Sequence, residues 1–142
     1  MVCYSTRMIP FSVSFASGVP IYEQVVYAAK KAILAGDLAA GERFPSVRAL
    51  SQELKINANT AHKVVIELVS EGLLEVQPGL GTVVAARPVY GPSDRAHLLK
   101  NEVEHLVVEA KRLGITLDGL LSGIVDHWHE LTPQEDAGRR SR

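Results

Sequence analysis

The chain opens with an alternation of apolar and polar residues, which then changes to a helical period. Residues 11–15 read Phe, Ser, Val, Ser and Phe, a pattern compatible with a short strand within an N-terminal arm, residues 1–17. Beyond Pro20, apolar residues recur at helical spacing up to Gly36, where a helix can stop. Those apolar positions are Tyr22, Val25, Val26, Ala29 and Ile33. We therefore expect a first helix between Pro20 and Gly36.

Two further helical patterns follow, separated by a brief turn at Ile56. Ser46 can cap the first, because its hydroxyl accepts a hydrogen bond from a free backbone N–H, and this helix should run to about Leu54. Asn57 can cap the second, which should end near Gly72. Their apolar residues are Val47, Leu50, Leu54, Val64, Val65, Leu68 and Val69. Short helices joined by so brief a turn predict a helix-turn-helix.

A β-hairpin is expected directly after the third helix. Residues 73–76 and 82–85 are mostly apolar, and the segment between them carries Gly79 and Gly81, which suit a turn. Three helices followed by a hairpin predict a mainly α protein whose residues 18–86 form a winged helix-turn-helix.

A separate helical segment, residues 93–131, should follow a linker at residues 87–92. Its apolar residues recur in a heptad-like seam up to Gly114, and a strongly apolar helix capped by Thr116 comes next. Two helices are too few to bury this surface alone. We expect a second copy of the chain to cover it, with folding back onto the N-terminal part as the alternative. The candidate dimerisation residues are Leu99, Val103, Leu106, Leu113, Leu117, Leu121, Ile124 and Trp128. The polar tail, residues 132–142, should be disordered.

Composition restricts the possible classes of protein. The 142 residues have a net charge of −1 and are 46% hydrophobic, which is enough for a core, and no apolar run is long enough to span a bilayer. The single cysteine, Cys3, excludes a disulfide framework, so we expect a cytoplasmic protein. Because the chain as a whole is not basic, any surface for nucleic acid must come from local clustering of cations.

Catalytic and metal sites have little support in the sequence. His127 and His129 are two residues apart on an expected helix and face different sides, and His97 and His105 are poorly spaced for one face. Ser46 has no histidine at a motif-like spacing. We therefore expect no enzyme activity, no metal and no cofactor.

The third expected helix begins with small polar groups and one cation. These residues are Asn57, Asn59, Thr60, His62 and Lys63. Asparagine can pair bidentately with adenine, threonine can contact a thymine methyl, and a helix N-terminus favours phosphate. Arg48 lies in the first turn of the preceding helix, where a cation opposes the helix dipole, so a phosphate contact explains it better than the fold does. In isolation the polar start suits a capped surface helix. Beside the preceding helix and the glycine-rich hairpin, we interpret it as a DNA-reading surface.

Four motifs occur together in order: PIYEQV at 20–25, PSVRALSQEL at 45–54, INANT at 56–60 and EGLLEVQPGLGTVV at 71–84. They resemble the GntR superfamily of bacterial transcription regulators, and the short C-terminal segment resembles its YtrA subfamily. The resemblance implies a homodimer on a two-fold operator, with one recognition helix per half-site in the major groove and a wing that reaches the minor groove. The DNA contacts that it implies are Arg48, Asn57, Asn59, Thr60, His62 and Lys63, with Gly79, Gly81 and Thr82 in the wing.

We therefore expect a sequence-specific transcription regulator, most simply a repressor that occludes a promoter as a homodimer on an inverted repeat. Its expected partners are double-stranded DNA and a second copy of the chain, with no membrane. The alternative is a winged-helix module that binds a protein instead of DNA, because the wing at residues 75–81 carries no cation. A small-molecule effector is compatible with the first interpretation, in a pocket formed across the dimer.

Overall fold

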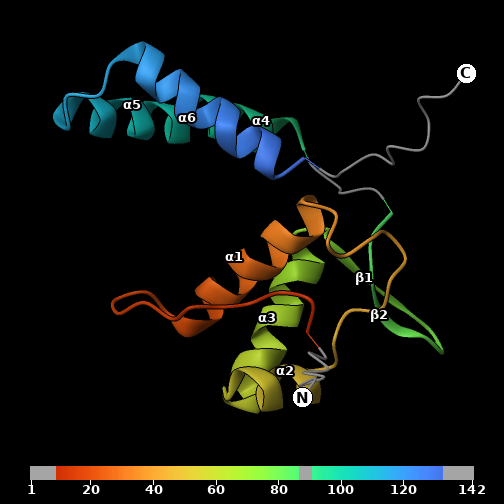
Figure 1. Cartoon of the computed structure of the whole chain (residues 1–142). Helices are drawn as coiled ribbons and strands as arrows, with labels where there is room; N and C mark the ends of the chain where they lie inside the picture. The colour runs from red at the N-terminus through yellow and green to blue at the C-terminus, as the bar shows by residue number, and fades with distance from the viewer. Residues whose placement is uncertain (1–8, 87–90, 133–142) are drawn as a thin grey trace, which may run out of the picture. The chain divides into compact units, whose positions relative to one another are not determined.

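The computed structural model describes residues 9–86 and 91–132, and these ranges belong to two compact units. Figure 1 draws the first unit in red to green and the second in green to blue. The expected linker lies mostly outside the described residues, as do Cys3 and the expected disordered tail from residue 133 onward. No helix within 9–86 or 91–132 is both long and apolar enough to cross a membrane.

The first unit, residues 9–86, contains three helices and one hairpin. The elements are α1 (Ile21–Leu34), α2 (Val47–Leu54), α3 (Ala58–Ser70), β1 (Leu74–Gln77) and β2 (Gly81–Val84). The strands pair antiparallel with Leu74 opposite Val84 and Gln77 opposite Gly81. Helix α3 packs against α1, α2 and β1, so it lies at the centre of the unit (Figure 1). This order and packing confirm the predicted winged helix-turn-helix.

The ends of the helices follow the capping residues that the sequence contains. The Ser46 hydroxyl accepts a hydrogen bond from the Ala49 N–H at 3.1 Å, and the Asn57 side chain accepts one from the Asn59 N–H at 2.8 Å. Helix α1 ends before Gly36, whose φ of +86° lies in the left-handed region that glycine adopts easily. The predicted starts of α2 and α3 and the stop after α1 are therefore confirmed.

Lys55 closes α2 in the left-handed region, with φ at 54°. A side chain there is strained, because Cβ crowds the following carbonyl. We expect Lys55→Gly to raise the free energy of unfolding by about 0.5–1 kcal/mol. Glycine relieves the backbone strain of the folded state, and part of this gain is offset because glycine also makes the unfolded chain more flexible. Chemical denaturation measures the change in stability. The matched control, Gln52→Gly inside α2, should lower stability by about 1 kcal/mol. A loss of stability in Lys55→Gly would contradict the assignment of strain.

The core of the first unit gathers apolar side chains from every one of its elements. It includes Ile9, Val25, Val26, Ala29, Leu38, Phe44, Leu50, Ala61, Val64, Leu68, Leu74 and Val84. Residues 11–15 form no strand, so that expectation was wrong. Phe11 and Val13 pack against the core while Ser12 and Ser14 are exposed, and Phe11 stacks on Phe44 with ring centroids 6.2 Å apart. The alternation of apolar and polar residues therefore reflects an irregular segment that is buried on one side only.

The hairpin gains a third line of backbone pairing from the segment before α2. Phe44 donates its N–H to the Thr82 carbonyl at 2.9 Å, and Val84 donates to Glu42 at 2.8 Å. Arg43 pairs with Val83 in an antiparallel bridge. Residues 42–44, between α1 and α2, therefore brace β2 and attach the wing to the helices.

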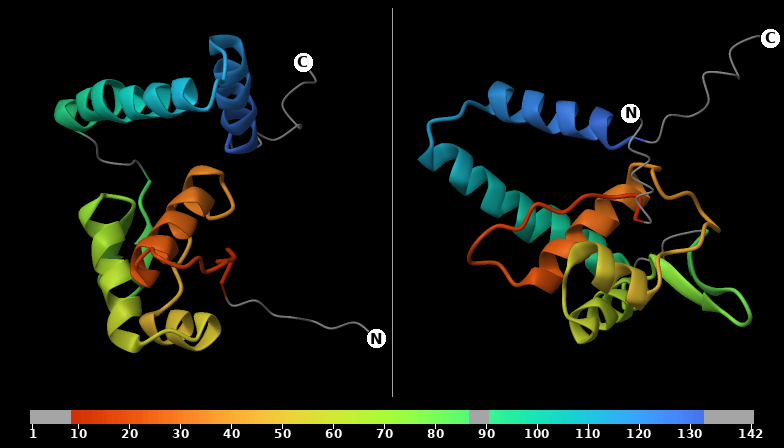
Figure 2. Two further views of the ribbon diagram at one scale, coloured as in Figure 1. Left: turned by 90° about the vertical axis from the view of Figure 1, so that its left-hand side faces the viewer. Right: turned by 60° about the horizontal axis from the view of Figure 1, so that its bottom comes forward.

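The second unit consists of a long helical rod and one further helix joined by a turn (Figure 2). The rod comprises α4 (Pro92–His97), η1 (Leu98–Glu102) and α5 (Val103–Arg112), and α6 spans Leu117–Glu130. Gly114 has a φ of +74°, and the Thr116 hydroxyl accepts from the Gly119 N–H at 3.1 Å, as the predicted stop and cap require.

A π turn interrupts the rod at η1. The Val103 N–H bonds to the Leu98 carbonyl, five residues back instead of the four of an α-helix. Each wider turn shifts the side chains that follow it around the helix. The heptad-like spacing predicted that Leu99 would lie in line with Leu106 and Leu113. Because of the π turn, Leu99 is turned away from that line.

Candidate nucleic-acid interface

Helix α3 presents its polar start to solvent and its apolar residues to the core. Ala61, Val64 and Leu68 are buried, which turns the opposite side of the helix outward. The predicted contact residues Asn57, Asn59, His62 and Lys63 are exposed, and Thr60 is half-buried. The exposed polar groups therefore gather over the first two turns, beside backbone N–H groups whose partial positive charge favours an anion. The same exposed side ends in an apolar residue, Ile66.

Arg48 stands exposed in the first turn of α2, next to the buried Ala49 and Leu50. Its side chain makes no ion pair or hydrogen bond with any residue in 9–86 or 91–132. Its guanidinium therefore keeps its five donors for a ligand, and a phosphate matches their planar geometry.

The wing turns at residues 77–80 in the manner of a type II β-turn. The Leu80 N–H donates to the Gln77 carbonyl at 3.1 Å, with Pro78 and Gly79 as the central residues. Gly79 has a φ of +82° and Gly81 one of +88°, and a Cβ at either would meet no atom within 4 Å. Glycine is therefore required by backbone conformation, and the space beside it is open.

The tip of the wing is apolar. Val76 is 67% exposed and Leu80 52% exposed, whereas Thr82 is half-buried. The wing can therefore offer its backbone and apolar surface to a groove, but its tip brings no cation.

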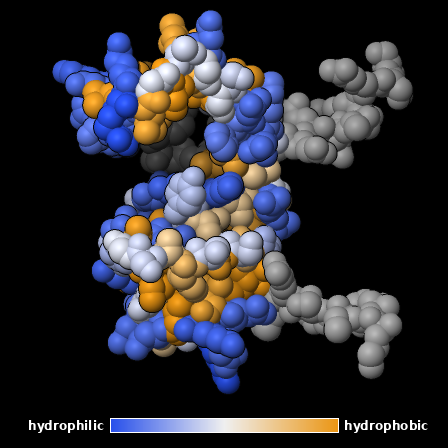
Figure 3. Space-filling model, turned by 60° about the vertical axis from the view of Figure 1, so that its left-hand side comes forward, coloured by the Kyte–Doolittle hydropathy of each residue, from blue (hydrophilic) through white to orange (hydrophobic). Residues whose placement is uncertain are grey.

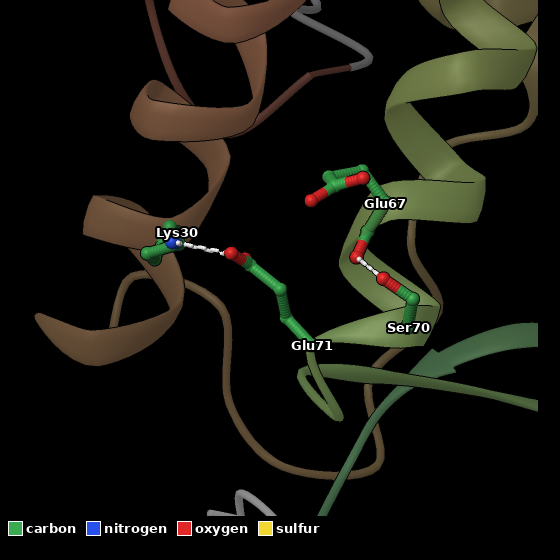
Figure 4. Close-up of polar contacts among 4 residues, drawn as sticks. All are labelled: Lys30, Glu67, Ser70 and Glu71. Carbon is green, nitrogen blue, oxygen red and sulfur yellow. Dashed lines mark hydrogen bonds and ion pairs between the residues drawn. The ribbon is translucent and has the colours of Figure 1, made fainter. Parts of the chain in front are cut away.

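Two lysines beside the α1–α3 contact have different partners. The Lys30 ammonium, on α1, lies 2.9 Å from a carboxylate oxygen of Glu71, which follows the last turn of α3. Figure 4 shows this ion pair together with Glu67 and Ser70 of α3. This pairing offsets the charge of Lys30. The Lys63 ammonium instead lies over the Tyr22 ring, 3.9 Å from its centroid.

Arg43 is a candidate that sequence reasoning left out. Its side chain is exposed, and its backbone pairs with Val83, itself opposite Glu75 in the hairpin. Directly paired residues share a face of the sheet, so Arg43 and Glu75 flank the buried Val83 at the base of the wing. The sequence contained one available signal, a cation just before the buried Phe44, but nothing in it indicated the pairing.

The apolar residues of the second unit are mostly exposed. Ala110 is its one buried residue among 91–132, and orange, apolar side chains appear on the surface of the upper unit in Figure 3. All the candidate dimerisation residues are exposed: Leu99, Val103, Leu106, Leu113, Leu117, Leu121, Ile124 and Trp128. So much apolar surface on two helices is typical of a face that another protein surface covers.

Two of the histidines lie near single carboxylates. His127 lies 3.3 Å from Glu130 and His97 lies 3.9 Å from Glu102, all on exposed positions. Within 9–86 and 91–132 no group of three or more histidine, cysteine or acidic residues is arranged to hold a metal ion.

Comparison with known proteins agrees with this geometry. The family described as "Bacterial regulatory proteins, gntR family" matches residues 21–84. The "HTH-type transcriptional repressor YtrA" of Bacillus subtilis (strain 168) is 32% identical over 108 residues, which cover 73% of this chain and 81% of the relative. The "Uncharacterized HTH-type transcriptional regulator YhcF" of the same strain is 30% identical over 110 residues, covering 78% and 91%.

The fold has a counterpart among solved structures. The crystal structure of a "Transcriptional Antiterminator from Listeria monocytogenes EGD-e" superposes with a TM-score of 0.74 at 23% identity, covering 90% of this chain and 97% of that one. The matching family and the named relatives are regulators of transcription and not enzymes. The chain thus belongs to the GntR family of bacterial regulatory proteins, with relatives of the YtrA type, and is a DNA-binding transcription regulator.

Proposed function

We propose that the protein is a repressor that binds an inverted-repeat operator as a homodimer and occludes the promoter. The observation that carries this proposal is the outward-facing polar start of α3, together with the exposed Arg48 of α2, whose side chain has no ion-pair partner among residues 9–86 and 91–132. The family assignment favours DNA over the protein partner that the uncharged wing had left open. The repressor named among the relatives supports the direction of regulation. Such a regulator acts in the cytoplasm, where bacterial DNA lies, and needs no cofactor for binding.

The roles divide between base reading and phosphate contact. Asn59, Thr60 and His62 would read base edges in the major groove, because they are short or flexible polar groups near the N-terminal end of the helix. Arg48 and Lys63 would contact phosphates. Asn57 would cap α3 beside the backbone. In the wing, Gly79, Gly81 and Thr82 would approach the minor groove.

Self-association would use the exposed apolar residues of α5 and α6. The proposed partner is a second copy of the chain, because most soluble oligomers are formed by identical chains. In a two-fold dimer the same apolar surface of each copy covers the other. Two-fold symmetry in the protein then requires an inverted repeat in the DNA. An effector, if one binds, would occupy a pocket formed between the two copies.

We expect Arg48→Ala to weaken operator binding broadly and Asn59→Ala to relax base preference, each by about 1–3 kcal/mol. The arginine contacts a phosphate, which every DNA sequence has, whereas the asparagine amide donates to and accepts from the edge of a particular base. Fluorescence anisotropy against the protein's own upstream DNA and a scrambled duplex of equal length, over a salt series, measures both effects.

The control for this pair is Lys111→Ala, which removes an exposed cation from α5 in the other unit and should leave binding unchanged. Wild-type binding that is tight, salt-sensitive and confined to the native duplex supports a specific regulator. Wild-type affinity in both Arg48→Ala and Asn59→Ala would show that the site has been placed wrongly.

A further inference from the structure

Tyr22 and Lys63 connect the first turn of α1 to the exposed side of α3. The Lys63 ammonium lies 3.9 Å from the centroid of the Tyr22 ring, within the range of a cation–π interaction. Lys63 belongs to the polar start of α3, and Tyr22 is half-buried between that helix and its own. A residue of α1 therefore holds a side chain of the DNA-reading helix.

The partner of Lys63 leaves its charge intact. At the other end of the same helix contact, Lys30 donates to Glu71, a carboxylate that offsets the ammonium charge. The Tyr22 ring is neutral, and it attracts the ammonium through the negative face of its π system. An ammonium has three donors and remains free to hydrogen-bond on the side away from the ring. Lys63 is thus fixed in position and still able to meet an anion.

The phenol of Tyr22 stays protonated in this setting. Its hydroxyl lies 3.3 Å from Glu23, to which it donates. The negative charge of Glu23 raises the pKa of Tyr22 above its ordinary value, with smaller contributions from burial and from Glu67. The ring therefore remains a neutral platform at physiological pH.

We propose that Tyr22 is a positioning residue for DNA binding, whose ring holds the Lys63 ammonium where it meets a phosphate of the operator. The inference rests on the proposed phosphate contact of Lys63. Binding normally restricts a long, freely rotating lysine side chain, and that restriction reduces affinity. A lysine that is already held over a ring gives up less freedom on binding, so its bond to the phosphate is stronger than the same lysine would make alone.

The test is a double-mutant cycle on the full-length protein, with operator affinity measured over a salt series. Tyr22→Leu keeps an apolar side chain but removes the ring, and should weaken binding roughly two- to tenfold. Lys63→Met should weaken binding and lower the slope of log affinity against log salt by roughly 0.9 for each phosphate that Lys63 neutralises, or roughly 1.8 for a dimer. In the Lys63→Met background, Tyr22→Leu should have no further effect.

Two more variants of Tyr22 separate the ring from the hydroxyl and from the fold. Tyr22→Phe retains the ring and should bind the operator like the wild type. Tyr22→Met replaces the ring by an unbranched apolar side chain. If thermal melting shows that Tyr22→Leu is unfolded, Tyr22→Met takes its place. Agreement between the leucine and methionine variants would assign the weaker binding to the absence of the ring.

Several outcomes would overturn the inference. Equal weakening by Tyr22→Leu with and without Lys63 would show that Tyr22 acts by itself, through its own DNA contact or through packing. A decrease in affinity in Tyr22→Phe as large as in Tyr22→Leu would assign the effect to the hydroxyl. An unchanged salt slope in Lys63→Met would show that Lys63 meets no phosphate. Failure of the proposed function looks different, because the wild type itself would then not prefer the operator to a scrambled duplex.

Discussion

Leu121→Glu should convert the proposed dimer to a monomer and weaken binding to the full proposed operator by on the order of 100- to 10,000-fold. Leu121 lies on α6 and is 48% exposed, so a charge there costs the single copy little. In the dimer the same carboxylate would be buried against apolar side chains, where a charge without a partner is strongly unfavourable. Two linked half-sites reinforce each other through effective concentration, and a monomer loses that reinforcement.

Sedimentation equilibrium and operator titration check the two parts of this expectation separately. Ser122→Glu is the matched control: it places the same charge on the neighbouring exposed position of α6 and should remain dimeric. Affinity for a single half-site should be the same in wild type, Leu121→Glu and Ser122→Glu, because residues 9–86 are unchanged. A Leu121→Glu protein that still sediments as a dimer would contradict the assigned interface.

Leu68→Ala should lower the free energy of unfolding of the DNA-binding unit by about 2–5 kcal/mol. Leu68 is fully buried at the centre of the core, on the inner side of α3. Its truncation removes apolar packing and leaves a cavity that α1, α2 and the hairpin cannot fill without moving. Since domains of this size are stable by only about 5–15 kcal/mol, the variant should be close to unfolding and should bind DNA poorly.

Ile66→Ala offers a control on the same helix. Ile66 is 53% exposed, so its truncation should change stability by only about 0.5 kcal/mol. Urea unfolding should be followed by far-ultraviolet circular dichroism, because the single tryptophan, Trp128, lies on α6 and reports on the other unit. Equal decreases in stability in Leu68→Ala and Ile66→Ala would mean that α3 is not oriented as described.

Much of the fold was predictable because it depends on neighbours along the chain. Ser46 and Asn57 cap the helices that they were expected to cap, since a cap needs only a side-chain oxygen and an N–H two or three residues on. Gly36 and Gly114 end helices for a similarly local reason. The glycine-rich hairpin and the period of α1 likewise required no knowledge of distant contacts.

The candidate site was predicted in composition but not in its internal arrangement. The polar start of α3 and the position of Arg48 followed from the order of residues. That Lys30 is paired and Lys63 is held over a ring did not follow, because Glu71 and Tyr22 are each about forty residues away in the sequence. A count of cations cannot tell which of them already have partners in the fold.

By itself, the sequence determined the helices, their caps and the hairpin, because these depend on short-range hydrogen bonds and on periodic burial. The family followed from the resemblance of four sequence motifs. Only the tertiary structure decided that Arg43 pairs with the wing, that Phe11 and Val13 pack on the core without forming a strand, and that Tyr22 holds Lys63. The π turn at η1 also appears only there, since no residue type marks it. The first three features join segments that are distant in the sequence, so they depend on the packing of the whole unit. The π turn depends on the backbone path of the rod.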